Sequence, residues 1–150
     1  MLKIYCVHPI SGLDATSVFN YYDRIQKTLE SYGYIVFSPM YAKNELRTEI
    51  KFRESDYRNP TCTNHAIFRR DSFMVNQSDV VFANFLSAKN VSVGSCMELA
   101  WASWLHKHTI VIMEKENPHR HAFILEAADI VFETEEEALI YLKTLAKKEI

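Results

Sequence analysis

The chain has 150 residues, a length that fits one domain with a sizeable core. Its composition is typical of a soluble globular protein, with 48% hydrophobic and 24% charged residues. A formal net charge of -2 provides no basic surface field, so we expect neither nucleic acid nor a membrane as a partner. No apolar run approaches the length of a membrane-spanning helix.

The cysteines and the first residues bear on the compartment. Cys6, Cys62 and Cys96 are an odd, scattered set without a C-x-x-C pair. Residues 1–4 lead directly into an apolar segment and do not resemble a signal peptide. We therefore expect a reducing, cytoplasmic location.

Short β-rich runs alternate with helical patterns along the chain. The predicted strands are residues 3–7, 34–37, 80–85, 109–113 and 129–132. The predicted helices run from Asp14 or Thr16 to about 32, from Asn64 to 78, from about Cys96 to 108, from 121 to 128, and from 134 onward. On the third helix, the expected packing face consists of Met97, Trp101, Trp104 and Leu105, with the two tryptophans as core or interface residues. Such alternation predicts an α/β fold, a single doubly wound parallel sheet of five strands in the flavodoxin-like order 2-1-3-4-5.

Residues 41–63 break this alternation. Charged, aromatic and turn residues mix there without a clear period. So long an irregular segment in a compact domain is typical of a lid or a substrate loop. A partly disordered surface loop is the alternative.

The stretch from 79 to 98 combines a buried strand, a polar loop and a helix start. Open α/β sheets bind ligands at the carboxyl ends of their strands, which is where this loop should lie. We expect Glu98 in the first helical turn, where the helix dipole partly stabilises its carboxylate, so that it can stay ionised at neutral pH. An ionised carboxylate beside a ligand site is a candidate nucleophile. The alternative is an ordinary first-turn acid without a chemical role.

Three motifs at compatible spacings carry a family resemblance. They are IYCVHPISG at 4–12, the pair Arg70 and Asp71 followed by SDVVFA at 78–83, and SVGSCMELA at 92–100. Together they resemble the nucleoside 2-deoxyribosyltransferase family, over nearly the whole chain and in the family's order. That family includes transferases acting on nucleosides and relatives that hydrolyse nucleoside 5'-monophosphates.

The resemblance implies three catalytic residues. Glu98 matches the nucleophile that attacks the anomeric carbon and holds the sugar covalently. Asp71 matches the acid that protonates or holds the departing base, and Tyr5 matches a tyrosine that orients the glutamate. The implied activity is cleavage of an N-glycosidic bond, with the sugar passed to water or to a second base. No cofactor or metal is implied.

The resemblance also implies substrate-binding residues in two segments. These are His8, Pro9, Ile10, Ser11 and Gly12 in the first turn, and Ser92, Gly94 and Ser95 before the nucleophile. Serine at 92 matches the nucleotide hydrolases, whereas the nucleoside transferases have an aspartate there. Ser11 stands where those hydrolases have a phosphate-binding arginine, so the sequence leaves nucleoside and 5'-monophosphate open.

Two other functions remain open at this stage. One is a non-catalytic nucleotide-sensing module on the same fold, and the other is a glycohydrolase of a larger nucleotide such as NAD. The histidines at 106, 108, 119 and 121 fit no closed zinc pattern, so no metal site is expected. His119, Arg120 and His121 would line the crevice or a subunit contact, or form a solvated loop. The resemblance implies a homodimer or a larger even assembly.

Overall fold

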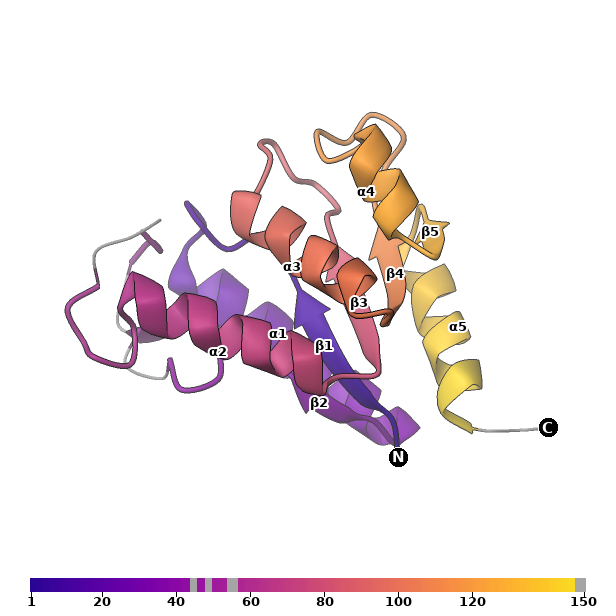
Figure 1. Cartoon of the computed structure of the whole chain (residues 1–150), viewed down its shortest axis with the longest axis horizontal. Coiled ribbons are helices and arrows are strands. Elements are labelled where there is room, and N and C mark those ends of the chain that lie inside the picture. The colour runs from indigo at the N-terminus through magenta and orange to yellow at the C-terminus, as the bar shows by residue number, and fades with distance from the viewer. Residues whose placement is uncertain (44–45, 48–49, 54–56, 148–150) are drawn as a thin grey trace.

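A computed structural model describes residues 1–43, 46–47, 50–53 and 57–147 of the chain. Five parallel strands form one sheet in the order β2-β1-β3-β4-β5, which confirms the predicted fold class and strand order (Figure 1). The strands are β1 (Lys3–Val7), β2 (Ile35–Phe37), β3 (Val80–Asn84), β4 (His108–Ile112) and β5 (Ile130–Phe132). The helices are α1 (Ala15–Tyr32), α2 (Asn64–Gln77), α3 (Val93–Trp104), α4 (Ala122–Ala127) and α5 (Glu135–Lys147).

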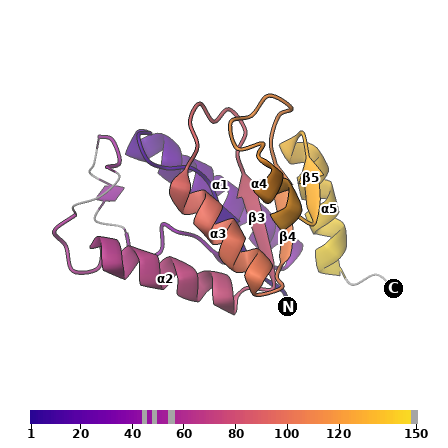
Figure 2. The ribbon, with the colours of Figure 1, turned by 45° about the horizontal axis from the view of Figure 1, so that its top comes forward.

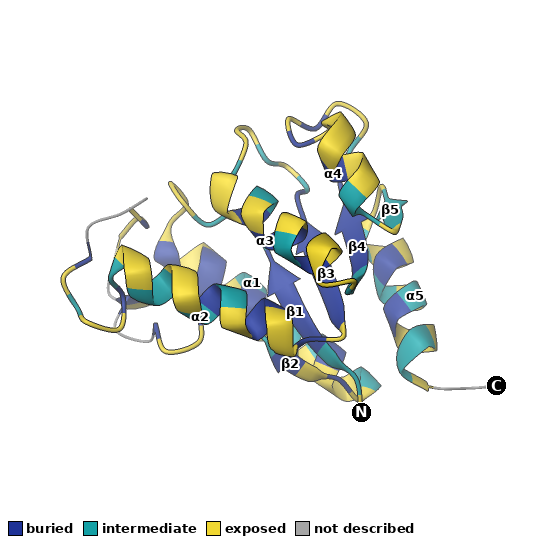
Figure 3. Ribbon diagram, in the orientation of Figure 1, coloured by how far each residue is buried: buried dark blue, intermediate teal, exposed yellow. Residues whose placement is uncertain are grey.

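The helices cover the two faces of the sheet in separate layers. α1 packs with α5 on one face, and α3 packs with both α2 and α4 on the other (Figures 1 and 2). Successive side chains of β1 point to opposite faces of the sheet and so enter two different cores. Ile4 and Cys6 belong to the core under α1 and α5, and Tyr5 and Val7 belong to the core under α2, α3 and α4. All of β3 is buried, as expected for the centre of a parallel sheet (Figure 3).

Local capping explains where the first two long helices begin and end. The Asp14 side chain accepts a hydrogen bond from the Ser17 N–H and so caps α1, while Gly33 ends the helix at a φ of 100°. α2 is capped by Thr63 and not by Asn64, because the Thr63 side chain accepts from the Ala66 N–H. The predicted cap was therefore wrong by one residue.

α3 differs from the prediction in both its start and its packing. It begins at Val93 and not near Cys96, because Ser92 caps it by accepting from the Ser95 N–H. Glu98 thus lies in the second turn and not in the first. The buried residues of α3 are Ser95, Glu98, Leu99 and Ala102. Trp104 is 85% exposed, and Met97 and Leu105 are also exposed, so the predicted packing face was wrong for these residues, whereas an interface position for Trp104 stays a prediction.

The described parts of the 41–63 segment pack onto the body of the protein. Leu46, Phe52 and Tyr57 are buried. Two backbone hydrogen bonds hold Phe52 to the turn after β1. Its carbonyl accepts from the Gly12 N–H, and its N–H donates to the Leu13 carbonyl. Residues 44–45, 48–49 and 54–56 of the segment lie outside the described residues. The described parts of the segment are therefore packed against the rest of the protein, whereas a role as a lid stays a prediction.

None of the helices among the described residues is long and apolar enough to cross a membrane.

Candidate active site

The site is built around a buried hydrogen bond between β1 and α3. The Tyr5 hydroxyl donates to Glu98 Oε1 at 2.7 Å. Tyr5 is fully buried on β1, and Glu98 is 8% exposed on α3. Burial and the neighbouring Glu98 carboxylate raise the pKa of Tyr5 well above its usual value, so the phenol keeps its proton and remains a donor. The bond fixes one carboxylate oxygen of Glu98.

Asp71 brings a second buried carboxyl group to Glu98 from α2. It is 7% exposed, and its charge acts on Glu98 and on Tyr5. Its buried Oδ1 atom has no hydrogen-bond partner among the described residues, which is rare for a carboxylate oxygen and marks a position for an incoming donor. The structure therefore brings together the three residues that the sequence singled out as catalytic.

The protonation of Glu98 differs from the prediction. Burial and the neighbouring Asp71 raise the pKa of Glu98 to about 8, against the lowering effects of the Tyr5 hydrogen bond and the Lys43 charge. The prediction of an ionised carboxylate at neutral pH was therefore wrong. The helix dipole acts mainly on the first turn, and Glu98 lies beyond it.

The turn after β1, residues 8–12, contributes a histidine whose ring is held in one orientation. His8 Nδ1 lies 2.9 Å from the Asn84 carbonyl oxygen, so Nδ1 carries the proton and donates. The His8 ring stacks on Tyr21 with 4.2 Å between ring centroids. Burial lowers the pKa of His8, which leaves Nε2 as an acceptor. Pro9 and Ile10 are half-buried, and Ser11 and Gly12 are exposed.

Ser92 is positioned by a histidine from the loop after β4. The Ser92 N–H donates to His119 Nε2 at 2.8 Å, so this nitrogen is unprotonated. His119 is 1% exposed and stacks on Phe85 with 4.0 Å between ring centroids. Burial lowers its pKa and keeps it neutral. The predicted crevice position of His119 is thus compatible with the structure, while the alternative of a solvated loop is wrong for this residue.

The start of α3 places the Ser92 hydroxyl beside the N–H groups of the first helical turn. The Ser92 hydroxyl oxygen accepts from the Ser95 N–H at 3.3 Å and from the Ser95 hydroxyl at 3.0 Å. Its own O–H is therefore free to donate elsewhere. A side chain at Gly94 would meet nothing within 4 Å, so the surface over this turn is open. A helix start of this kind favours an anion.

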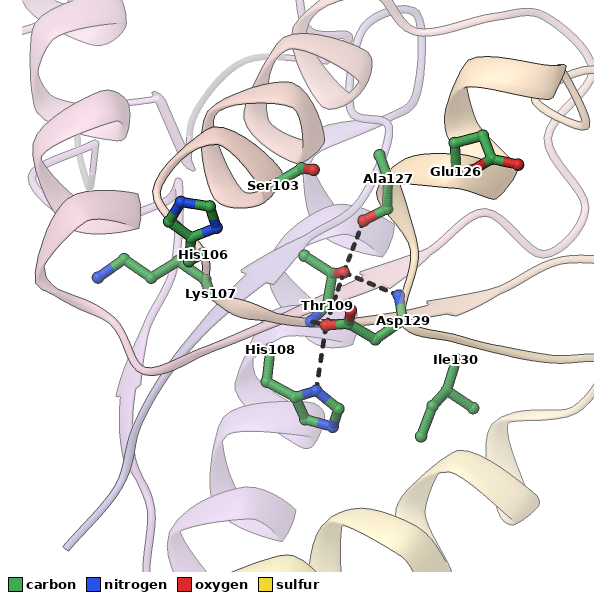
Figure 4. Close-up of a pocket in the computed structure, with 9 residues that line it drawn as sticks. All are labelled: Ser103, His106, Lys107, His108, Thr109, Glu126, Ala127, Asp129 and Ile130. Carbon is green, nitrogen blue, oxygen red and sulfur yellow. Dashed lines mark hydrogen bonds and ion pairs between the residues drawn. The ribbon is translucent and has the colours of Figure 1, made fainter.

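A separate hollow of about 530 Å³ lies at the opposite end of the sheet, beside the start of β4 (Figure 4). His108 and Thr109 both bond the Asp129 carboxylate there, and Thr109 also bonds the Ala127 carbonyl (Figure 4). This network joins β4 to β5 and leaves Glu98 at the other end of the strands. Among the described residues, no cluster of three or more histidine, cysteine, aspartate or glutamate side chains is arranged to hold a metal ion.

Lys43 is a site residue that the sequence did not indicate. Its Nζ atom lies 3.7 Å from Asp71 Oδ2, and the side chain is 2% exposed. It comes from the 41–63 segment, where no periodic pattern distinguishes inward from outward residues. The only available signal was a lysine close to a strand end, which is weak.

A parallel sheet with a buried Tyr–Glu–Asp cluster at its carboxyl edge defines an α/β enzyme site that uses carboxylates. Residues 11–140 match the family Nucleoside 2-deoxyribosyltransferase, which covers most of the chain. The chain belongs to this family, and it is accordingly a glycosyltransferase or glycosidase. The predicted resemblance is confirmed.

Solved structures share the fold at low sequence identity. A 2-deoxyribosyltransferase from Bacillus psychrosaccharolyticus is 18% identical with a TM-score of 0.66, covering 91% of this chain and 90% of that one. A CMP N-glycosidase from Clostridium botulinum is 14% identical with a TM-score of 0.60, covering 95% and 98%. A 2-deoxyribosyltransferase from Leishmania mexicana is 15% identical with a TM-score of 0.60, covering both chains completely. A search of curated proteins found no match.

Proposed function

We propose that this protein, acting as a single 1–150 domain, cleaves the N-glycosidic bond of a nucleoside 5'-monophosphate or a nucleoside, ribo or 2-deoxy. The sugar passes through a covalent ester with Glu98 to water or to a second base. The observation that carries this proposal is the buried hydrogen bond of 2.7 Å from Tyr5 to Glu98, beside the buried carboxyl of Asp71. Carboxylates in such a setting stabilise and trap the oxocarbenium character that develops at the anomeric carbon.

The three residues have separate tasks. In its ionised form, Glu98 attacks the anomeric carbon with the oxygen that Tyr5 does not hold. Asp71 directs its unpaired Oδ1 to an N–H of the departing base, or protonates the base when it carries the proton itself. Tyr5 keeps the Glu98 carboxylate oriented and is not changed by the reaction.

The start of α3 favours a phosphorylated substrate. Ser92 and Gly94 lie at the open start of α3 with the Ser92 O–H as a donor, and the buried Ser95 orients that hydroxyl by donating to its oxygen. An aspartate at position 92 would repel a phosphate dianion, whereas the serine O–H can donate to it. Hydrogen bonds to a charged group contribute roughly 1.5–3 kcal/mol each.

The remaining contacts come from the first turn and from the segment that lies over it. We assign sugar and base contacts to residues 8–12, with His8 Nε2 available as an acceptor. The 41–63 segment is bonded to this turn through Phe52 and is proposed to cover the bound substrate. Water would then be excluded from the ester until an acceptor enters.

The test is release of free base from a panel of nucleosides, their 5'-monophosphates and NAD, followed by chromatography. We expect a higher kcat/KM for the 5'-monophosphate than for the matching nucleoside. Ser92→Asp should reverse this preference, because its carboxylate repels the phosphate while Glu98 remains intact.

A matched control is Ser103→Asp, which adds the same charge at an exposed position in the last turn of α3. It should leave the preference unchanged. Equal or faster turnover of the unphosphorylated nucleoside by the unmodified protein would refute the phosphate assignment. Release of base from NAD alone would instead point to a larger nucleotide as substrate.

A further inference from the structure

A buried lysine lies beside the catalytic carboxylates without an assigned task. Lys43 follows β2, and its backbone is held by a hydrogen bond donated to Met40 and another accepted from Leu46. Its side chain is 2% exposed. Burial lowers its pKa, while the charges of Asp71 and Glu98 act to raise it, so the ammonium belongs to the same electrostatic cluster as the nucleophile.

Lys43 and Asp71 form a loose ion pair. Their Nζ–Oδ2 distance of 3.7 Å is an ion pair but exceeds the length of a good hydrogen bond. The second oxygen of Asp71, Oδ1, is buried and has no hydrogen-bond partner in the described ranges 1–43, 46–47, 50–53 and 57–147. Asp71 thus has an oxygen with bonding capacity left beside an ammonium that it does not hold tightly, which suits a group carrying both a donor and an acceptor.

Arg70 adds a second positive charge. Its Nη1 atom donates to the Thr61 carbonyl, whereas Nε and Nη2 are buried and have no partner within the part of the chain that the structure describes. Its charge acts on both Lys43 and Asp71. The carboxyl group of Asp71 is thus accompanied by the charges of Lys43 and Arg70, and that of Glu98 by the charge of Lys43.

Stability alone does not account for Lys43. Burial of an ammonium costs several kcal/mol, and an ion pair of 3.7 Å regains little of this cost. A methionine would fill the same space without that cost. The position of Lys43 is better explained by a charge that appears only during the reaction.

We propose that Lys43 contacts the leaving base, and that the site takes a base with a carbonyl oxygen next to the glycosidic nitrogen, as in oxo-pyrimidines. The proposal rests on the function proposed above. The ammonium donates to that oxygen, and Asp71 Oδ1 accepts from a ring or amino N–H where the base offers one. The Arg70 charge adds to the positive field at Asp71.

The chemical step balances without another reagent. The Glu98 carboxylate forms a C–O bond to the anomeric carbon as the C–N bond breaks, and the bonding pair goes to the base. Its negative charge is shared between the ring nitrogen and the carbonyl oxygen, where the Lys43 ammonium stabilises it and keeps its proton. Water or a second base then attacks the ester, which restores the Glu98 carboxylate and releases the proton that neutralises the departed base.

The test compares two leaving groups of different acidity on the same sugar phosphate. The substrates are 2'-deoxyuridine 5'-monophosphate and its 5-fluoro derivative, whose base leaves more easily. Lys43→Met should lower kcat/KM about 100-fold for the first substrate and only about 10-fold for the second, because a base that stabilises its own charge needs the ammonium less. Lys43→Arg should recover part of the loss.

The controls separate this contact from a general structural effect. The ratio between the two substrates does not depend on how much of the variant is folded, so a partly unfolded Lys43→Met still gives an answer. Lys27→Met, at an exposed position on α1, should leave both rates unchanged. The unmodified protein should also process the uracil nucleotide faster than 2'-deoxyadenosine 5'-monophosphate, whose base has no carbonyl.

Three results would overturn the proposal. An equal loss for both fluorinated and unfluorinated substrates would make Lys43 structural, and an unchanged rate would remove it from the site. Equal processing of the adenine nucleotide by the unmodified protein would refute the base class. If the unmodified protein releases base from no substrate in the panel, the proposed function itself fails and this inference with it.

Discussion

Glu98 meets opposite demands in the folded protein and in the proposed reaction. The surrounding interior favours the protonated carboxyl, with a pKa of about 8, whereas nucleophilic attack needs the carboxylate. The two causes of the raised pKa are burial and the neighbouring Asp71. A substrate that places positive character on the anomeric carbon would favour ionisation at the moment it is needed.

The pH dependence of activity follows from this pKa. Because ionised Glu98 is required, kcat/KM should rise about tenfold per pH unit below about pH 8 and level off above it. Asp71→Asn removes one cause of the raised pKa, so the rise should move to lower pH even though the plateau is reduced. The measurement is kcat/KM for base release between pH 5 and about 9.5.

Asp23→Asn removes a carboxylate from an exposed position on α1 and serves as the matched control. It should leave the profile unchanged. A profile that is flat from pH 5 to about 8 would contradict the assignment of Glu98 as the group that must ionise.

At the scale of elements, the start of α3 depends on a residue from another loop. His119 accepts the Ser92 N–H and stacks on Phe85, so it connects the loop after β4 to the cap of α3. Asn117 supports it, because His119 Nδ1 donates to Asn117 Oδ1 at 3.1 Å. The position of Ser92, and with it the proposed phosphate contact, therefore depends on the stack of His119 on Phe85.

His119→Ala should loosen this connection without removing a catalytic group. Loss of the acceptor leaves the Ser92 N–H unsatisfied, which costs about 1–3 kcal/mol in the free energy of unfolding. The KM of a nucleoside 5'-monophosphate should rise more than kcat falls, while the KM of the nucleoside should change less. Steady-state kinetics and denaturant unfolding measure these effects.

His65→Ala, at an exposed position in the first turn of α2, is the control for loss of a histidine. It should change neither stability nor KM appreciably. If His119→Ala changed the nucleoside and the 5'-monophosphate equally, the connection from His119 to the phosphate contacts would be wrong.

The strand order was predictable from the sequence because the alternating pattern of buried runs and amphipathic helices is strong. The start of α3 was not, because Val93 and Gly94 are poor helix formers and concealed the cap at Ser92. The sequence could not decide whether Trp104 is a core or an interface residue, because a large aromatic side chain at helical spacing fits both, and the structure excludes the core. Lys43 was missed because only the folded segment shows that it points inward.

At the scale of the whole molecule, one layer of helices exposes large apolar side chains. Trp104 on α3 is 85% exposed, Phe123 on α4 is 80% exposed, and Phe73 on α2 is 61% exposed. These helices pack side by side on the same face of the sheet (Figure 2). Several exposed aromatics on one layer favour contact with another protein surface, and a second copy of the chain is the simplest candidate.

We therefore expect a homodimer or a larger even assembly. Trp104→Glu combined with Phe123→Glu should shift the protein to monomers, because it places two charges in the expected interface. Light scattering after size-exclusion chromatography measures the mass. Ile140→Glu changes an exposed apolar residue on α5, in the opposite layer, and should have no effect. A fully active monomer of the unmodified protein would contradict the expectation.

The covalent ester with Glu98 is the central claim, and the mass of the intact protein tests it most directly. The protein is mixed with the nucleotide or nucleoside that it processes fastest, quenched in acid during turnover, and analysed by mass spectrometry. We predict an added mass equal to the sugar or sugar phosphate without its base, on the peptide that contains Glu98, and no added mass in Glu98→Gln. Sustained base release by Glu98→Gln, or an adduct on another residue, would contradict the account.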